Sequence, residues 1–319
     1  MNTHLQSLRE ILLSLESEIG QTIVGQKSLI RKIIIALFSG GHILLEGVPG
    51  LGKTKTVKTL AEVLGFEFKR ISFTPDLLPS DLTGVEIYRP QTGRFEIRKG
   101  PIFTNILLAD EINRTPPKVQ SALLEAMEES QVTIGLETFS LPDPFFVIAT
   151  ENPLDHEGTY PLPEAELDRF FMKILLDYPT QSDEIEILSK TSKNQNEKKG
   201  SRHQSPIKPE ELFEMRNFIV DAIHIDHHIY EYIGDILTAT RAKNDNISYG
   251  ASTRAGLALR DGSRICALLD GRDYVTPDDI KYISYDVLRH RIGRSYESIA
   301  DNIAPDEIIR EILESVKIH

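Results

Sequence analysis

The stretch Gly47-Val48-Pro49-Gly50-Leu51-Gly52-Lys53-Thr54 carries the strongest structural signal in this 319-residue chain. It matches the pattern of a phosphate-binding loop, and it lies between an apolar run at 42–46 and a helical stretch at 53–64, which is the context that the pattern requires. Glycines let backbone N–H groups turn inward around phosphate oxygens, and the helix N-terminus adds its positive end. We therefore expect this loop to cradle phosphates.

Two side chains of the loop have separate expected roles. Lys53 should reach the β- and γ-phosphates of a nucleotide, and the Thr54 hydroxyl should ligate Mg²⁺. The backbone cradle is expected from the remaining loop positions, which are Gly47, Pro49, Gly50, Leu51 and Gly52.

A second motif supplies the acids that hydrolysis needs. The apolar run at 106–109 ends in Asp110 and Glu111. In a chain that also holds a phosphate-binding loop, we expect Asp110 to hold the magnesium ion and Glu111 to polarise the attacking water. The pattern therefore predicts nucleotide hydrolysis as well as binding.

The rest of the first half alternates between strands and helices. Further apolar runs at 70–73, 145–150 and 171–176 indicate strands, and the stretch 118–128 indicates a helix. Such alternation is typical of an α/β fold with a mostly parallel sheet covered on both faces. Two segments interrupt it, 84–99 and 131–141, and both predict β-hairpins.

The pattern changes near residue 180. We expect an α/β nucleotide-binding core at 1–180, a linker or loop at 181–205 and an all-helical domain at 206–319. Leu5, Leu8, Leu12, Leu15 and Ile19 recur at helical spacing and predict an N-terminal helix.

Composition narrows the functional classes. The net charge of −12, from 36 basic and 48 acidic residues, disfavours nucleic acid as a partner because phosphate-backbone binding normally needs a basic face. A single cysteine fits a reducing compartment. No uncharged apolar run is long enough to span a bilayer or to act as a secretory signal. We expect a cytoplasmic protein with no membrane insertion of its own, which a partner could recruit to a membrane.

Two polar clusters favour ordinary surface roles. His224, His227 and His228 are close in sequence and could bind a metal, but the pattern favours solvated helix-face histidines because no second ligand group completes the set. Glu125, Glu128 and Glu129 are interpreted as a solvated helix face. No Asn-Lys-x-Asp guanine reader is present, so ATP is favoured over GTP.

Several motifs together resemble the MoxR-type AAA+ ATPases of the helix-2-insert clade, and the resemblance covers nearly the whole chain. Val24-Gly25-Gln26 resembles the segment that lies against the adenine. The stretch 73–81 is similar to one distinctive of MoxR proteins and leads into the first hairpin. Residues 110–114 resemble the Walker B segment, and Gln131–Leu141 takes the place of the hairpin before sensor 1.

Three further motifs assign single residues by this resemblance. Residues 149–153 match sensor 1, which implies that Asn152 helps place the water. Residues 162–170 resemble the arginine-finger box, which implies that Arg169 reaches the nucleotide of a neighbouring subunit. Residues 251–255 resemble sensor 2, with Arg254 as the sensing residue. The family usually has Gln in place of Glu151 and Pro in place of Thr253.

The resemblance implies an AAA+ core followed by a helical lid, Mg-ATP bound between the subunits of a ring that is expected to be hexameric, and chaperone-like remodelling of protein clients. Such clients often contain von Willebrand factor A domains. An arginine supplied in trans would stabilise the charge on the transferring phosphoryl group. Two alternatives stay open, a nucleic-acid motor and a nucleotide-gated structural switch without useful turnover.

Overall fold

The computed structural model describes residues 3–154, 158–193 and 207–318. At its centre lies a five-stranded sheet with the order β2-β5-β8-β1-β9, and all four neighbouring pairs are parallel. The strands are β1 (Ile43–Glu46), β2 (Phe68–Ser72), β5 (Ile106–Asp110), β8 (Phe146–Glu151) and β9 (Met172–Leu175). The parallel α/β core expected from the sequence is confirmed, and each expected strand is present with ends shifted by a few residues.

Both faces of the sheet are covered, as parallel strands require. Alternate residues of β1 illustrate this, because Ile43 and Leu45 belong to one buried cluster and Leu44 belongs to the other. The first cluster includes α1 (Thr3–Thr22), α2 (Lys27–Phe38) and α3 (Lys53–Leu64), and the second includes α5 (Pro117–Glu129). The expected helices at 5–19, 53–64 and 118–128 are therefore confirmed.

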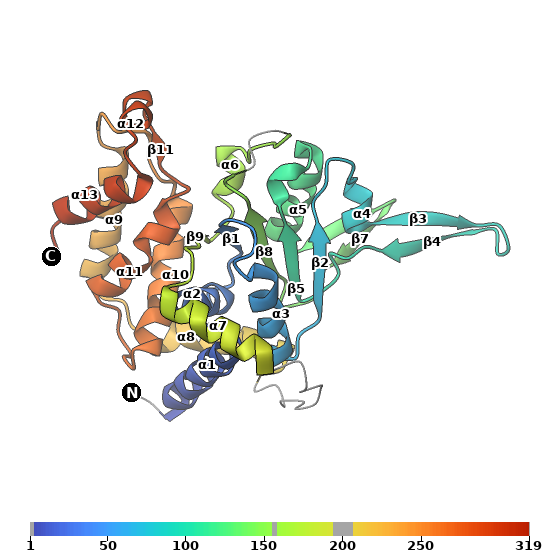
Figure 1. Ribbon diagram of the computed structural model, residues 1–319, viewed down its shortest axis with the longest axis horizontal. Helices are drawn as coiled ribbons and strands as arrows, with labels where there is room; N and C mark the ends of the chain where they lie inside the picture. Colours follow the sequence, from blue (N-terminus) through green and yellow to red (C-terminus); the bar gives the residue numbers. More distant parts are fainter. Residues whose placement is uncertain (1–2, 155–157, 194–206, 319) are drawn as a thin grey trace.

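Two antiparallel hairpins interrupt the alternation where the sequence predicts them. The first pairs β3 (Gly84–Arg89) with β4 (Arg94–Lys99) after the short helix α4 (Pro79–Thr83), and it projects away from the body of the molecule (Figure 1). The second pairs β6 (Gln131–Ile134) with β7 (Glu137–Ser140) directly after α5. The Lys99 ammonium lies 5.0 Å from the Phe139 ring centroid, so the bases of the two hairpins are in contact.

The C-terminal part is helical and lies on the opposite side of the sheet from the first hairpin (Figure 1). It contains α8 (Pro209–Ala222), α9 (His227–Arg241), α10 (Thr253–Leu269), α11 (Pro277–Leu288), α12 (Tyr296–Ala300) and α13 (Pro305–Ser315). Two short strands, β10 (Ile247–Tyr249) and β11 (Gly293–Arg294), form a small ribbon within it. This lid joins the same buried cluster as α1, α2 and α3.

The segment 181–205, expected to be a linker or loop, begins with a helix instead. Helix α7 covers Gln181–Lys193, and residues 194–206 lie outside the described part of the chain. Thr180 and Asp183 cap its first turn reciprocally, since each backbone N–H donates to the side chain of the other, over 3.1 Å and 3.3 Å. Lys190 and Glu186 pair one turn apart at 2.8 Å. Such a capping box favours a helix. The prediction of a loop relied on the polar composition of the segment and did not consider this box.

No helix in the described ranges is long and apolar enough to cross a bilayer.

Candidate functional site

The loop at 47–52 joins the end of β1 to the start of α3. Gly50 and Gly52 have φ values of 92° and 76°, a left-handed conformation that glycine adopts without strain. The Lys53 ammonium donates to the Gly47 carbonyl over 2.6 Å. The loop therefore closes on itself with Lys53 lying across it, and its shape fits a phosphate group.

Gln26 holds this loop from the preceding segment. Its amide donates to the Leu51 carbonyl over 2.6 Å, and its carbonyl accepts from the Thr56 hydroxyl over 2.8 Å. One side chain therefore connects the loop to the first turn of α3. Gly25, with φ of 77°, lies against Asp183 of α7, where an added Cβ would come within 2.7 Å of that carboxyl group. This close approach explains a glycine at 25.

A cavity of about 790 Å³ opens beside the loop. Its walls come from the segment around Val24, the loop itself, the first turn of α3 and helix α7. Residues that line it include Ile23, Val24, Gln26, Pro49, Gly50, Leu51, Gly52, Tyr178 and Ile187. The apolar walls at Ile23, Val24 and Ile187 suit a flat base, and the loop suits its phosphates. An adenine nucleotide therefore fits the residues present.

The acids lie at the carboxyl end of β5, two strands from β1 in the sheet. Asp110 accepts from the buried Thr150 hydroxyl over 2.7 Å, and the same hydroxyl accepts the Glu111 backbone N–H over 2.9 Å. Glu111 has φ of 59°, a left-handed conformation that is strained for a residue with a side chain. Thr150 of β8 therefore orients both acids at once.

The carboxylates of Asp110 and Glu111 each pair with an arginine of the same chain. Arg70 donates to Asp110 over 2.6 Å, and Arg114 contacts Glu111 over 3.1 Å. Burial lowers the pKa of Lys53, while the nearby carboxylates of Asp110, Glu111 and Glu46 act in the opposite direction. The lysine and the two acids therefore belong to one electrostatic site.

Magnesium would be held by the oxygen atoms of Asp110 and Thr54. Carboxylate and hydroxyl oxygens are donors that Mg²⁺ accepts, and the residues present fit the ion in this respect. Arg70 pairs with one Asp110 oxygen, so a bound ion would share this carboxylate with the guanidinium. In the described part of the chain no group of three or more His, Cys, Asp or Glu side chains is placed to hold a metal ion.

The segment that resembles sensor 1, residues 149–153, begins within β8 and continues beyond its end. Asn152 is buried, and its side-chain oxygen accepts the Leu154 N–H over 3.1 Å. The unusual residue before it, Glu151, contacts Lys173 at 3.5 Å, and Lys173 also contacts Glu46 at 2.6 Å. Burial raises the pKa of Glu151, and Lys173 offsets part of that effect. The extra carboxylate is thus paired with Lys173.

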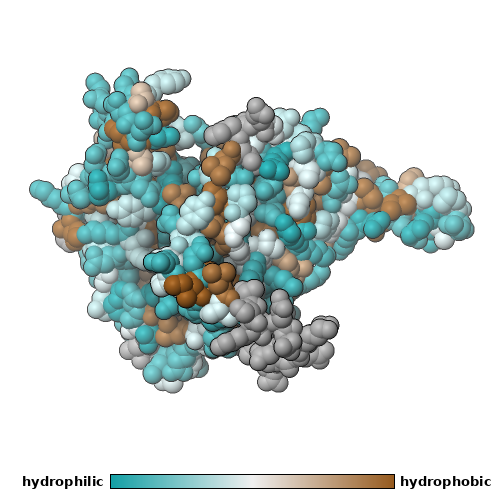
Figure 2. Space-filling view, in the orientation of Figure 1, coloured by the Kyte–Doolittle hydropathy of each residue, from teal (hydrophilic) through white to brown (hydrophobic). Residues whose placement is uncertain are grey.

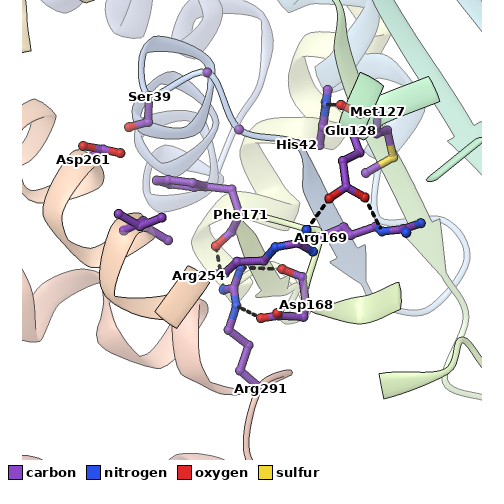
Figure 3. A pocket seen from close by; sticks show the side chains of 14 residues that line it. Ser39, His42, Met127, Glu128, Asp168, Arg169, Phe171, Arg254, Asp261 and Arg291 are labelled. Carbon is purple, nitrogen blue, oxygen red and sulfur yellow. Dashed lines mark hydrogen bonds and ion pairs between the residues drawn. The ribbon is translucent and has the colours of Figure 1, made fainter. Parts of the chain in front are cut away.

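Arg169 and Arg254 lie elsewhere, in a second cavity of about 280 Å³ (Figure 3). None of the residues that line it belongs to the phosphate-binding loop or to the first cavity. Arg169 precedes β9, just after α6 (Glu164–Leu167), and Arg254 is the second residue of α10. The structure therefore brings the two arginines together and keeps them apart from the loop of the same subunit.

Glu128 is exposed, as expected for a solvated helix face. Beyond that expectation, its carboxylate contacts Arg169 Nε at 3.0 Å and Arg254 through the other oxygen. The reason is tertiary, because the end of α5, the turn after α6 and the start of α10 meet there (Figure 3). The spacing of residues along helix α5 cannot predict this contact between three separate elements.

Asp168 ties the arginine-bearing turn to the lid. It accepts from the Ser252 hydroxyl over 2.8 Å and from Arg291 Nε over 2.8 Å. Arg291 is buried and also donates to the carbonyls of Phe170 and Phe171. The turn that carries Arg169 is therefore fastened to two points of the lid.

Sequence reasoning missed several of these supporting residues, which are Thr150, Arg70, Glu128, Ser252 and Arg291. Thr150 and Ser252 lie inside motifs that the sequence singled out, so a closer examination of those motifs could have found them. Arg70 and Arg291 carry no local signal, because their partners lie 40 and 123 residues away in the chain.

Comparison with known proteins supports one family. Residues 42–172 match the family model described as the ATPase family associated with various cellular activities (AAA), and residues 239–312 match the AAA lid domain. Chaperone MoxR1 of Mycobacterium tuberculosis is 43% identical over 309 residues, which cover 94% of this chain and 80% of that protein. The uncharacterized protein YeaC of Bacillus subtilis is 45% identical over 98% of this chain and 96% of its own.

A crystal structure of a candidate ATPase from Cytophaga hutchinsonii superposes with a TM-score of 0.88. The two chains are 46% identical, and the match covers 100% of each.

Proposed function

Because the chain belongs to the MoxR family of AAA ATPases, we propose that it binds Mg-ATP at the subunit interfaces of a ring and couples hydrolysis to the remodelling of a protein client. ATP binding and hydrolysis and a chaperone-like activity follow from the family itself. The ring, the magnesium ion, the residue roles and the client are the proposal.

The main observation behind the proposal is that the phosphate-binding residues and the two arginines of one chain lie in separate places. Lys53, Asp110 and Glu111 form one electrostatic group around the loop, whereas Arg169 and Arg254 line a different cavity. A guanidinium close to the transferring phosphoryl group speeds hydrolysis by about 10³- to 10⁵-fold. We infer that this chain supplies its two arginines to a neighbour's nucleotide and receives the neighbour's in return.

Within one site the residues would act as follows. The loop and Lys53 bind the phosphates, and Val24 and Gly25 lie against the base. Mg²⁺, held by Thr54 and Asp110, would offset the charge of the phosphates. Glu111 would accept the proton of the attacking water, which Asn152 helps to orient. Head-to-tail contacts of this kind close into a ring when their rotation permits, and we propose six subunits.

The client surface that we propose includes the first hairpin. Tyr88 and Phe95 pair on it with ring centroids 5.2 Å apart, and both are exposed. Figure 2 shows apolar side chains along this hairpin behind a hydrophilic tip. Exposed aromatic side chains on a projecting element suit a protein surface. We propose a von Willebrand factor A domain protein as client, and a cytoplasmic ring that such a client can recruit to a membrane.

Neither alternative has a specific observation in its favour. A nucleic-acid motor would need a strongly basic surface on the hairpin, but Glu86 and Glu96 offset part of the charge of its four basic residues, and Arg89 pairs with Glu96 at 2.9 Å. A switch without turnover would not need an acid held in a strained backbone conformation beside the loop, as Glu111 is.

Two substitutions test the proposal. Lys53→Ala should weaken ATP binding by at least about 10-fold, because it removes a charged phosphate ligand. Glu111→Gln should leave ATP affinity nearly unchanged and slow hydrolysis by about 10²-fold or more, because it removes the base. Equilibrium binding of a fluorescent ATP analogue and phosphate release give the two quantities. Unchanged hydrolysis by Glu111→Gln would refute the catalytic assignment.

A further inference from the structure

We infer that Glu128 is a positioning residue that holds Arg169 and Arg254 together as one unit aimed at the neighbouring subunit's nucleotide. The inference rests on the proposed function, in which these arginines act in trans. Its basis is one carboxylate with two arginine partners (Figure 3): Oε2 of Glu128 contacts Arg169 Nε at 3.0 Å, and Oε1 contacts Arg254 Nη2.

The three side chains come from three separate elements. Glu128 lies in the last turn of α5, Arg169 in the turn between α6 and β9, and Arg254 in the first turn of the lid helix α10. Glu128 is therefore the connection between the core arginine and the lid arginine.

Electrostatics explains why a carboxylate is needed. Two guanidinium groups that share one site repel each other, and this repulsion would separate them in the absence of a phosphate. Glu128 cancels one of the two positive charges and leaves a net charge of about +1 on the three groups. The pair then stays together and still attracts the terminal phosphate of ATP.

The geometry leaves donors for that phosphate. The contact between Glu128 and Arg169 is at Nε, and among the described residues no hydrogen bond is recorded from the two terminal nitrogens of Arg169. These nitrogens carry the N–H groups that bind phosphate oxygens in pairs. Glu128 can therefore fix the direction of the guanidinium without competing for its outer edge.

The surroundings support a fixed position. The pair of Asp168 with the buried Arg291 holds the backbone next to Arg169, and Ser252 caps α10 next to Arg254 while donating to the same Asp168. The backbones of both arginines are thus anchored, and Glu128 is the group that orients their side chains.

The test uses Glu128→Gln in the full chain, which keeps the size of the side chain and removes its charge. A Gln oxygen can accept from one arginine, but its NH₂ group cannot accept from the other. We expect kcat to fall by about 10- to 100-fold, because small misplacements of a catalytic group cost this much. KM for ATP should change by less than about threefold, because the loop that binds ATP lies in the other cavity.

The matched control is Glu129→Gln, which changes the neighbouring exposed glutamate and should leave kcat within about twofold of wild type. The thermal midpoints of Glu128→Gln and wild type should agree within about 3 °C, because partly exposed ion pairs contribute little to stability. If Glu128→Gln folds poorly, Glu128→Asp keeps the charge and should have a kcat above that of the Gln variant.

A double-mutant cycle separates positioning from other roles. In an Arg169→Ala background, Glu128→Gln should lower the residual kcat by a smaller factor than in wild type, because one of its two arginine partners is already absent. An equal loss in both backgrounds, or an unchanged kcat in the single variant, overturns the inference while the trans mechanism stands. If Arg169→Ala itself turns over at the wild-type rate, the proposed function fails and the inference fails with it.

Discussion

At the residue scale, the backbone of Glu111 is the feature most directly related to turnover. A non-glycine residue with φ of 59° has a conformational cost of about 1 to 3 kcal/mol when strained. The Thr150 hydroxyl accepts its N–H over 2.9 Å and donates to Asp110 over 2.7 Å. The fold therefore holds the proposed base in a fixed orientation beside the proposed metal ligand.

His42 gives a pH-dependent prediction. Burial lowers the pKa of His42 from its usual 6.5 to about 4. The unfolded chain therefore binds a proton at His42 more readily than the folded chain. The contribution of His42 to the free energy of unfolding is fully present above pH 6.5 and is lost as the pH falls towards 4. The difference corresponds to about 3 kcal/mol from this one residue. In His42→Gln, the free energy of unfolding should change less steeply with pH across this window.

Urea unfolding between pH 4 and 7 measures this slope. Burial also lowers the pKa of His290, so a slope of the same sign remains in the variant. The control is His227→Gln, which alters an exposed histidine and should keep the wild-type slope. A His42→Gln slope equal to that of wild type would show that His42 does not carry the effect.

At the element scale, the attachment of the lid to the arginine-bearing turn is the main structural device. Asp168 accepts from Ser252 at the start of α10 and from Arg291 after α11. The Arg291 side chain is only 3% exposed, and that of Asp168 is 20% exposed. A movement of the lid would therefore be transmitted to the turn that carries Arg169.

Asp168→Asn tests this attachment. It leaves a buried guanidinium without its carboxylate, which should lower the free energy of unfolding by about 3 kcal/mol. Ser252→Ala removes only the cap and one hydrogen bond, and it should cost about 1 kcal/mol. Chemical denaturation of the two variants measures both values. Equal stability of Asp168→Asn and wild type would contradict the assigned role of this pair.

The elements were predictable where the signal is local, and the contacts between them were not. Apolar runs and the phosphate-binding loop predicted the strands and the helix at 53–64, and the interruptions at 84–99 and 131–141 predicted the hairpins. The capping box of Thr180 and Asp183 was overlooked, so α7 was taken for a loop. The meeting of Glu128 with Arg169 and Arg254 depends on packing between the core and the lid, and no sequence spacing encodes it.

At the scale of the whole molecule, the core and the lid are not separate bodies. One buried cluster includes Leu12 of α1, Ile34 of α2, Val57 of α3, Leu259 of α10 and Ile283 of α11. The expected division at 1–180 and 206–319 remains a prediction about domains, but the two parts share apolar packing. Since interiors are close-packed, the two parts should shift together when either moves.

The arrangement of the whole chain also bears on how the active site is completed. One subunit holds the loop and acids near one cavity and its two arginines in another. In the proposed mechanism a single subunit has an incomplete site, and the proposed ring would complete each site between two neighbours. This arrangement is the central claim.

Mixing two inactive variants tests it most directly. Lys53→Ala loses its own nucleotide but keeps both arginines, and Arg169→Ala keeps its nucleotide but loses the arginine that its neighbour needs. Each variant alone should release phosphate at or near background. Mixed in equal amounts, they should form interfaces in which an intact site meets an intact Arg169, and phosphate release should rise well above the sum of the two separate rates. A mixture no faster than that sum would contradict the account.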